Sequence, residues 1–253
     1  MYFQDEKHFK SMCGYDIEGQ WYPRVTKIVE IKAKPALYRF YAEAANFAEG
    51  EEIKQKSASE GTLIHETVEK ILLGERPEVS PLISPAIAAL QEFLFNRGIQ
   101  VDPEFVEHRV KSDEHRYAGT IDALAWIDGK FGVLDIKTSY AIFRDYNLQT
   151  SAYLCALRSQ LPNLSTRWIL RIDQAYTCLV CGATLRPKGG RNKIRVNKHA
   201  IACSDDAHQW GELKGDIELQ EFPYFQQDFK AFLGAKVLWE WENDYWLRRI
   251  GYL

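Results

Sequence analysis

The chain has 253 residues, 46% of them hydrophobic and 26% charged, so it has enough apolar material for a folded core and no signature of disorder. Its 32 Lys and Arg against 35 Asp and Glu give a formal net charge of −3, which excludes a polycation, although a local basic surface would still attract phosphate. No apolar run reaches the roughly 18 residues of a transmembrane helix, and residues 1–30 lack the apolar core of a signal peptide, so we expect a cytoplasmic protein without a membrane partner.

The first half of the chain is predicted to be mainly helical after an irregular lead-in over residues 1–23. Each predicted helix is marked by an apolar stripe, by a capping residue or proline at its start, or by a glycine at its end. The helices are expected over residues 27–31, from residue 35 onward, over 61–73 and over 85–95.

The apolar pattern then changes to the alternation that is typical of strands. The predicted elements are strands at 104–110, 117–127, 130–137 and 167–172, a helix at 146–159 and a long helix at 223–248. We expect the first three strands to form a small antiparallel meander. The sequence therefore predicts one α/β domain, whose parts are a core with N-terminal helices at 1–176, a basic insert with cysteine and histidine residues that could bind a metal at 177–211, and a C-terminal helix at 212–253 that completes the core.

A strong hairpin signal, Asp128-Gly129, stands between two strand-like runs. With these two residues as the turn, Asp122 lies directly opposite Asp135, on the face that also carries Lys137. Two facing carboxylates repel each other unless a cation lies between them, and Mg²⁺ or Mn²⁺ prefers such oxygen ligands. The pattern predicts a metal site, and the alternative is an exposed polar face on an edge hairpin.

The segments around these residues, Gly-Thr-Ile-Asp at 119–122 and Asp-Ile-Lys-Thr-Ser at 135–139, resemble the acidic core of the PD-(D/E)xK nuclease superfamily, in its RecB-like branch. Gly-Thr-Leu-Ile-His at 61–65 is similar to the helical His motif of that branch, and Gln-Thr-Ser-Ala-Tyr at 149–153 to its QxxxY motif. Tyr-Pro-Arg-Val-Thr at 22–26 resembles the lead-in of phage-type and mitochondrial genome-maintenance exonucleases. The motifs stand in the family's order and span roughly residues 22–173.

The resemblance implies an α/β fold with a restriction-endonuclease-like core, a small mixed central sheet flanked by helices and an inserted zinc-ribbon-like finger. It also implies a DNA nuclease that depends on Mg²⁺ or Mn²⁺. The implied metal ligands are His65, Asp122, Asp135 and the carbonyl oxygen of Ile136. Lys137 would orient or deprotonate the attacking water. Gln149 and Tyr153 would organise the site and contact the scissile strand.

Taken from the residues alone, three of these positions have other interpretations. His65 lies beside the buried stripe of its helix and would then be a core histidine held by a structural hydrogen bond. Gln149 and Tyr153, four residues apart on one helix face, would be an ordinary amphipathic pair. Glu107 is expected to be a strand-surface carboxylate, and a place beside the acidic pair is the alternative.

The resemblance further implies an exonuclease that hydrolyses phosphodiester bonds in DNA repair, recombination or phage replication. Its partners would be single- or double-stranded DNA and a helicase or recombination protein. The alternative is a catalytically inactive module with the nuclease fold, which binds nucleic acid or serves as a scaffold. The sequence favours the enzyme, because none of the implied acidic, histidine and lysine positions is lost.

The five cysteines include a knuckle-like CxxC pair followed by glycine, which in a reducing cytosol indicates a metal site more than a disulfide. A closed tetrahedral zinc site would take Cys178, Cys181, Cys203 and His208, with His199 as the rival fourth ligand. Some RecB-like nucleases hold an iron–sulfur cluster instead, and here Cys13 would then join the same three cysteines. The third interpretation is reduced thiols in a loop.

The segment 186–198 contains six basic residues and no acidic one. Gly189-Gly190 in its middle predicts the tip of a β-hairpin. Such a hairpin would hold phosphates without reading sequence, and the alternative is a solvated charged loop. The predicted nucleic-acid-binding residues are Arg186, Lys188, Arg191, Lys193, Arg195 and Lys198.

Overall fold

The computed structural model describes residues 3–196 and 202–253. Its N-terminal segment forms α1 (Glu6–Cys13) and a hairpin of β1 (Gly14–Ile17) and β2 (Gln20–Pro23), so the predicted irregular lead-in was wrong. Asp5 caps α1 by accepting a hydrogen bond from the amide of His8. The helix buries only Phe9 and Cys13, which is too few positions for a periodic pattern to be visible in the sequence.

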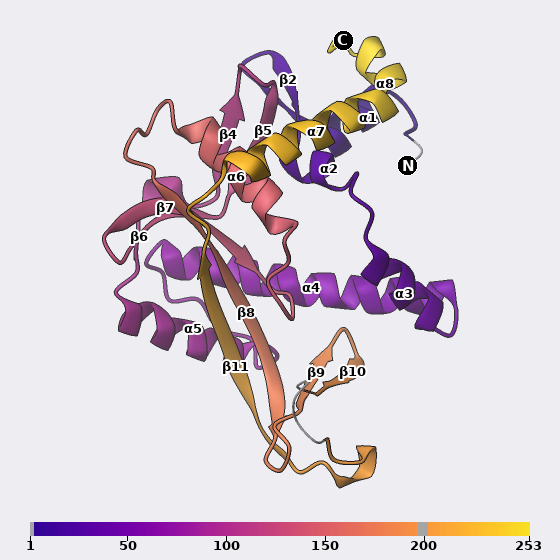
Figure 1. Ribbon diagram of the computed structural model, residues 1–253, viewed down its shortest axis with the longest axis vertical. Coiled ribbons are helices and arrows are strands. Elements are labelled where there is room, and N and C mark those ends of the chain that lie inside the picture. The colour runs from indigo at the N-terminus through magenta and orange to yellow at the C-terminus, as the bar shows by residue number, and fades with distance from the viewer. Residues whose placement is uncertain (1–2, 197–201) are drawn as a thin grey trace.

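Four helices precede the main sheet: α2 (Val25–Val29), α3 (Pro35–Glu43), α4 (Phe47–Leu72) and α5 (Ser84–Arg97). All four were predicted, but α4 begins at Phe47 and not at residue 61. Asn46 caps it there by accepting a hydrogen bond from the amide of Glu49 at 2.9 Å. The first half of α4 is polar and mostly exposed, so no apolar stripe marks it. Together with α3 it extends to the right of the sheet in Figure 1.

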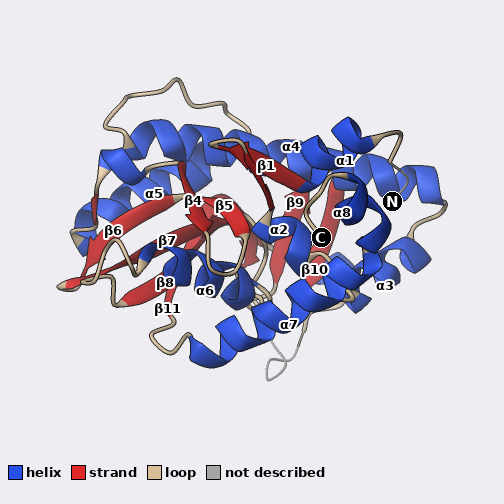
Figure 2. Ribbon diagram, turned by 90° about the horizontal axis from the view of Figure 1, so that it is seen from above, coloured by secondary structure: helices blue, strands red, loops and turns tan. Residues whose placement is uncertain are grey.

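A mixed sheet of seven strands forms the centre of the molecule (Figure 2). Its strands are β3 (Gln100–Val101), β6 (Ala123–Ile127), β7 (Lys130–Lys137), β8 (Thr166–Cys178), β9 (Thr184–Lys188), β10 (Arg191–Arg195) and β11 (Trp210–Glu221). Among the described strands of this sheet only β7 and β8 are parallel, and α6 (Tyr146–Leu157) connects them. The predicted α/β class, with a small mixed sheet flanked by helices, is confirmed.

The long strand β8 has one neighbour along one of its edges and two successive neighbours along the other. The first edge pairs with β11 over most of the length of β8. The other edge pairs with β7 as far as Lys137 and Arg171, and then with β9 at Tyr176 and Thr177. The hairpin of β9 and β10 therefore continues the sheet beyond the end of β7, within the same sheet as the core. This arrangement brings its side chains to the end of β7.

The predicted three-stranded meander was wrong, because β4 (His108–Ser112) and β5 (Tyr117–Ile121) form a separate two-stranded sheet. The single strand expected at 117–127 breaks at Asp122, which lies between β5 and β6. The main-chain carbonyl of Asp122 accepts a hydrogen bond from the amide of Glu107, and its carboxylate accepts one from the amide of Ile136. At Asp122 the chain therefore stops pairing with β4 and begins to pair with β7.

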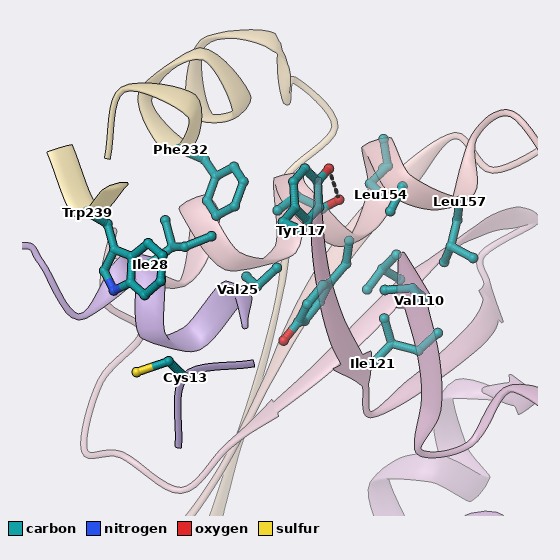
Figure 3. Close-up of a cluster of buried hydrophobic side chains, with 14 of the residues drawn as sticks. Cys13, Val25, Ile28, Val110, Tyr117, Ile121, Leu154, Leu157, Phe232 and Trp239 are labelled. Atoms are coloured by element: carbon teal, nitrogen blue, oxygen red, sulfur yellow. Dashed lines mark hydrogen bonds between the residues drawn. The ribbon is translucent and has the colours of Figure 1, made fainter. Parts of the chain in front are cut away.

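The helix predicted at 223–248 is divided at Asn243 into α7 (Gln226–Glu242) and α8 (Asp244–Arg249), and β11 precedes both. One buried cluster joins α1, α2, α6 and α7, and Figure 3 shows Tyr117, Phe232 and Trp239 in it. A second cluster lies between the sheet and the helices α4 and α5. Among the described residues, no helix has the length and apolar character that crossing a membrane requires.

Candidate functional site

The β6–β7 hairpin brings two acidic side chains together. Its turn is the predicted pair at 128–129, and both residues have positive φ angles, 51° and 77°. The predicted register is confirmed by the pairing of Ala123 with Leu134. The paired residues end there, and Asp122, one position before β6, reaches β7 through the hydrogen bond that its carboxylate accepts from the amide of Ile136. The turn and this hydrogen bond together bring Asp122 to the part of β7 that carries Asp135.

The two carboxylates have different partners. Asp122 is half-buried and accepts a hydrogen bond from the amide of Ile136 at 2.5 Å. Asp135 is 1% exposed, and its Oδ1 accepts a hydrogen bond from Nε2 of Gln149 at 3.2 Å. Its buried Oδ2 forms an ion pair with Nζ of Lys137 at 2.7 Å. A carboxylate oxygen has more than one lone-pair site, so this ion pair leaves room for a hard cation as well.

The charges of the site oppose one another. Burial raises the pKa of both aspartates, that of Asp135 to about 6, while the ammonium of Lys137 counteracts this rise. Burial alone would lower the pKa of Lys137, but the two carboxylates outweigh it and the pKa is raised. The ammonium of Lys137 therefore stays charged, whereas the raised pKa of Asp122 and Asp135 disfavours their ionised form. A divalent cation at their oxygens would favour the ionised form of both.

The main chain adds an oxygen on the same side. Beyond Leu134, β7 no longer pairs with β6, while its other edge stays paired with β8. The N–H and C=O of one residue in an extended strand project to the same side. Because the amide of Ile136 faces Asp122, its carbonyl oxygen faces the same open edge. The carbonyl implied as a ligand is thus on the side of the carboxylates.

His65 lies on α4 beside Ile64 and Val68, which are buried against the sheet. Burial and the charge of Lys137 lower the pKa of His65, although Asp135 acts in the opposite sense. The neutral imidazole is therefore favoured, which is the form that binds metals. Among residues 3–196 and 202–253, His65 and the two aspartates do not gather their ligand atoms within 4.8 Å of one another. The imidazole therefore interacts electrostatically with Asp135, but it is not within ligand distance of both aspartates.

One face of α6 supports the acidic pair. Nε2 of Gln149 donates to Asp135 and also lies 3.0 Å from the hydroxyl of Tyr153, to which it donates. Tyr153 is 2% exposed. Its ring packs so closely on β5 that a Cβ at Gly119 would lie 2.4 Å from it. The glycine of the segment 119–122 is therefore needed for the close approach of helix and strand.

Glu107, which the sequence predicts to be a strand-surface carboxylate, is exposed but lies in a turn beside Asp122 and not in a strand. It lies in a turn with φ 49°, and its amide donates to the main-chain carbonyl of Asp122 at 3.0 Å. Partial burial, followed by the charges of Asp122 and Glu69, raises the pKa of Glu107 to about 7. In the β4–β5 pairing His108 is opposite Ile121, so the next position puts Glu107 opposite Asp122. Knowledge of this register would have indicated that Glu107 lies beside the acidic pair.

A second cluster contains the predicted sulfur and nitrogen ligands. One ligand atom from each of four side chains lies within 4.8 Å of all the others: Cys178, Cys181, Cys203 and His208. Sγ of Cys181 is 3.5 Å from Nδ1 of His208, and the His208 ring stacks on Trp210 at 4.6 Å. Three thiols and an imidazole fit a closed tetrahedral zinc site. The predicted gathering of these four side chains is confirmed.

Two of the three thiols, those of Cys178 and Cys181, have a lowered pKa and are predisposed to ionise, whereas burial and the two neighbouring thiols raise the pKa of Cys203 to about 11. Desolvation would raise the pKa of Cys178, but amide hydrogen bonds and His208 outweigh it and lower the pKa to about 6. Cys13, which the iron–sulfur alternative requires, is instead buried in the core near α2, where burial raises its pKa to about 11. His199, the rival ligand, lies outside the described residues. The cluster therefore has the donor set of zinc rather than of four thiolates.

The predicted basic hairpin is present. Its tip is Gly189-Gly190, with positive φ angles of 65° and 78°. The tip rests on α4, where a Cβ at Gly189 would collide with Oγ of Ser57 and the carbonyl oxygen of Ile53. The hairpin is therefore docked on α4 and held at a fixed distance from it.

Two of the six basic residues expected to contact nucleic acid face into the protein. Arg186 forms an ion pair with Asp173, and Lys188 is 9% exposed. Both donate a hydrogen bond to the carbonyl oxygen of Thr138. Lys198 lies outside the described residues.

The other described cations of the hairpin border a cavity of about 180 Å³ between the hairpin and the helices α3 and α4. Its walls are Phe40, Ile53 and Ser57 on the helices and the basic residues at 186, 188, 191, 193 and 195 on the hairpin. Arg191 pairs with Glu43 at 3.1 Å, and Arg195 lies 3.9 Å from the centre of the Tyr140 ring. The lining of the cavity is therefore basic, and Arg186 and Lys188 connect it to the end of β7 through their hydrogen bonds to Thr138.

Comparison with known proteins adds little. No family model and no curated protein matches the chain. A solved structure described as the crystal structure of SSO0001 is similar at a TM-score of 0.34 and 13% identity, over 84% of this chain and 71% of that one. That likeness is too slight to carry an argument about fold or function.

Proposed function

We propose that the chain is a divalent-metal-dependent nuclease with a restriction-endonuclease-like core, which hydrolyses phosphodiester bonds in DNA. The observation that carries the proposal is the hydrogen bond from the amide of Ile136 to Asp122, which brings this carboxylate to the part of β7 where Asp135 forms an ion pair with Lys137. Buried acids in such an arrangement are costly unless they serve a cation or a proton transfer. Their resemblance to the nuclease motif agrees with the first of these uses.

The donor set fits Mg²⁺ or Mn²⁺, because it consists of carboxylate and carbonyl oxygens with one neutral imidazole. Asp122, Asp135 and the Ile136 carbonyl would hold the ion, with His65 beside them. A bound ion supplies a Lewis acid and lowers the pKa of a water molecule. Lys137 places a fixed positive charge where the phosphate gains negative charge. Gln149 keeps the Asp135 carboxylate in its orientation through the hydrogen bond to Oδ1.

Two further features support a nucleic-acid substrate. The positive cavity of the hairpin attracts a phosphate backbone without regard to sequence. The Cys/His cluster at the base of the hairpin gives it a structural anchor, which zinc would close. Exonuclease action on a strand end is the form of activity that we propose, following the family resemblance.

The proposal is tested by cleavage of end-labelled single- and double-stranded DNA and of circular single-stranded DNA, with Mg²⁺, Mn²⁺ or EDTA. We expect metal-dependent cleavage of linear DNA, loss of at least about 10³-fold in Asp122→Asn and Lys137→Gln, and little change in Asp128→Asn. Asp128 is a suitable control because it lies on the same hairpin, at the exposed turn. Cleavage of circles would indicate endonuclease action.

Metal-dependent cleavage that persists in purified Asp122→Asn and Lys137→Gln would overturn the assignment of the site. Binding of DNA without cleavage of any substrate would favour the inactive, nucleic-acid-binding module.

A further inference from the structure

Two arginines lie over the same aromatic ring near the acidic pair. The guanidinium carbon of Arg24 is 4.5 Å from the centre of the Tyr15 ring, and that of Arg109 is 4.4 Å from it. Arg24 directly precedes α2, Tyr15 belongs to β1, and Arg109 belongs to β4. Three segments far apart in the sequence thus bring two positive charges to one half-buried tyrosine.

No carboxylate balances these charges. Within residues 3–196 and 202–253, neither Arg24 nor Arg109 has an acidic oxygen within 4.0 Å, whereas the acids on β1 and in the β1–β2 turn are paired with lysines. Nε of Arg24 is buried and donates no hydrogen bond to the described residues. Like charges this close repel each other, and a buried donor without a partner is costly. Both penalties are removed if an anion binds between or beside the guanidinium groups.

The pair lies on the flank of the acidic site. The hydroxyl of Tyr15 is 3.4 Å from Oγ1 of Thr120, and Arg109 stands directly opposite Thr120 in the β4–β5 register. Thr120 is the penultimate residue of β5 and comes two residues before Asp122, where the strand breaks. In Figure 1 the strands β2, β4 and β5 lie above α4 and the basic hairpin β9–β10 lies below it.

We propose that Arg24, Tyr15 and Arg109 form a binding site for a backbone phosphate of the nucleic-acid strand whose scissile bond lies at Asp122 and Asp135. Guanidinium groups match phosphate oxygens in pairs, and the ring holds both groups in place at low entropic cost. The identity of the ligand rests on the proposed function. The strand is then held on one flank by this site and on the other by the positive cavity of the hairpin, which grips the backbone without selecting a sequence.

The test is binding of a labelled single-stranded DNA oligonucleotide without added Mg²⁺ or Mn²⁺, measured by fluorescence anisotropy over a range of salt concentrations. We expect Arg109→Gln and Arg24→Gln each to weaken binding by about tenfold at low salt. The slope of log affinity against log salt becomes shallower by about 0.7 in each, the value for one lost phosphate contact on a single strand. Arg109→Lys keeps the charge and hence the slope, but loses the paired hydrogen bonds and part of the affinity.

Arg158→Gln is the matched control, because Arg158 is also exposed and also lies over a ring, that of Phe225, at 5.0 Å. It is expected to bind like the wild type. Thermal unfolding identifies any variant that fails to fold, and Arg109, which is exposed on β4, carries the test if Arg24→Gln is unstable.

The outcomes separate this inference from the proposed function. Unchanged affinity and slope in Arg109→Gln, in a protein that cleaves DNA with Mn²⁺, overturn the phosphate site and leave the nuclease intact. Reduced affinity and slope in a protein that cleaves no substrate keep the phosphate site and overturn the nuclease. A wild-type protein that neither binds nor cleaves nucleic acid overturns both.

Discussion

The buried ammonium of Lys188 donates a hydrogen bond of 2.5 Å to the main-chain carbonyl oxygen of Thr138. Arg186 donates a second one to the same oxygen at 3.0 Å, and Gly61 of α4 packs so closely that a Cβ there would lie 2.8 Å from the Thr138 hydroxyl. Thr138 directly follows Lys137. The basic hairpin therefore holds the end of the strand that carries the candidate catalytic residues.

We expect Lys188→Met to lower the turnover number for metal-dependent cleavage by about tenfold or more, with little change in KM. The buried hydrogen bond from a charged donor contributes roughly 1.5–3 kcal/mol, and its loss frees the end of β7 and with it Lys137. Lys193→Met is the control, because Lys193 is exposed on the same hairpin and should affect KM rather than turnover. Steady-state kinetics on labelled DNA measure both. An equal loss of turnover in the two variants would contradict a positioning role for Lys188.

Burial, and then the nearby charge of Arg186, lower the pKa of Lys188 to about 8. Its pKa in the unfolded chain is about 10.4. Between these values the unfolded state binds more protons, so the contribution of Lys188 to stability rises with pH. We expect the free energy of unfolding of the wild type, relative to Lys188→Met, to increase by about 1–3 kcal/mol from about pH 7 to about pH 10. Urea unfolding at both pH values measures this difference, and a decrease would show that the charged form is the favoured one.

Gly119→Ala should destabilise the protein by about 1–3 kcal/mol, because its methyl group would overpack the interface between β5 and α6. The new Cβ would lie 2.4 Å from the Tyr153 ring, which must shift and take Gln149 with it. Cleavage should fall as well, since Gln149 orients Asp135. Gly234→Ala is the control: Gly234 is on α7 with no atom within 4 Å of a new Cβ, so alanine should stabilise the helix slightly. Thermal unfolding and cleavage rates compare the two, and equal stabilities would contradict the close packing.

The parts of the site that the sequence predicts are those fixed by local rules. The Asp-Gly turn sets the register of β6 and β7 as far as Ala123 and Leu134, and so brings Asp122 to the part of β7 that carries Asp135. The helical repeat alone puts Gln149 and Tyr153 on one face. The sequence likewise predicts the Cys/His cluster, because the spacing of the ligands limits which side chains can meet around a metal ion.

The features of the fold and site that the sequence does not predict depend mainly on pairing between segments far apart in the chain. Nothing local indicates that β9 continues along β8 where β7 ends, and this pairing turns Arg186 and Lys188 inward to Thr138. The break of the predicted strand at Asp122 has the same origin, since it depends on amides supplied by Glu107 and Ile136. The polar first half of α4 has no apolar stripe, and only its cap at Asn46 marks its start.

Binding of Mn²⁺ should weaken as the pH falls through about 6. Burial raises the pKa of Asp135 to about 6, and a carboxylate must be ionised to hold the ion. Below that pH a proton competes with Mn²⁺, so affinity falls by up to about tenfold per pH unit; above it affinity approaches a plateau. Isothermal titration calorimetry at several pH values measures this dependence. Asp135→Asn should remove both the tight binding and its pH dependence, and tight binding that persists in this variant would place the ion elsewhere.

The Cys/His cluster should hold one zinc ion per protein chain, and elemental analysis of the purified protein distinguishes zinc from iron. Cys203→Ser removes one of the four ligands and should lower both the zinc content and the melting temperature, because zinc binding supplies folding free energy to the segment between β8 and β11. Cleavage with added Mn²⁺ should also fall, since the hairpin that the cluster anchors holds Thr138 at the end of β7. Cys155→Ser, at a thiol outside the cluster, is the control and should keep its zinc and its activity. Full cleavage by zinc-free Cys203→Ser would show that the hairpin does not depend on the metal to hold the catalytic strand.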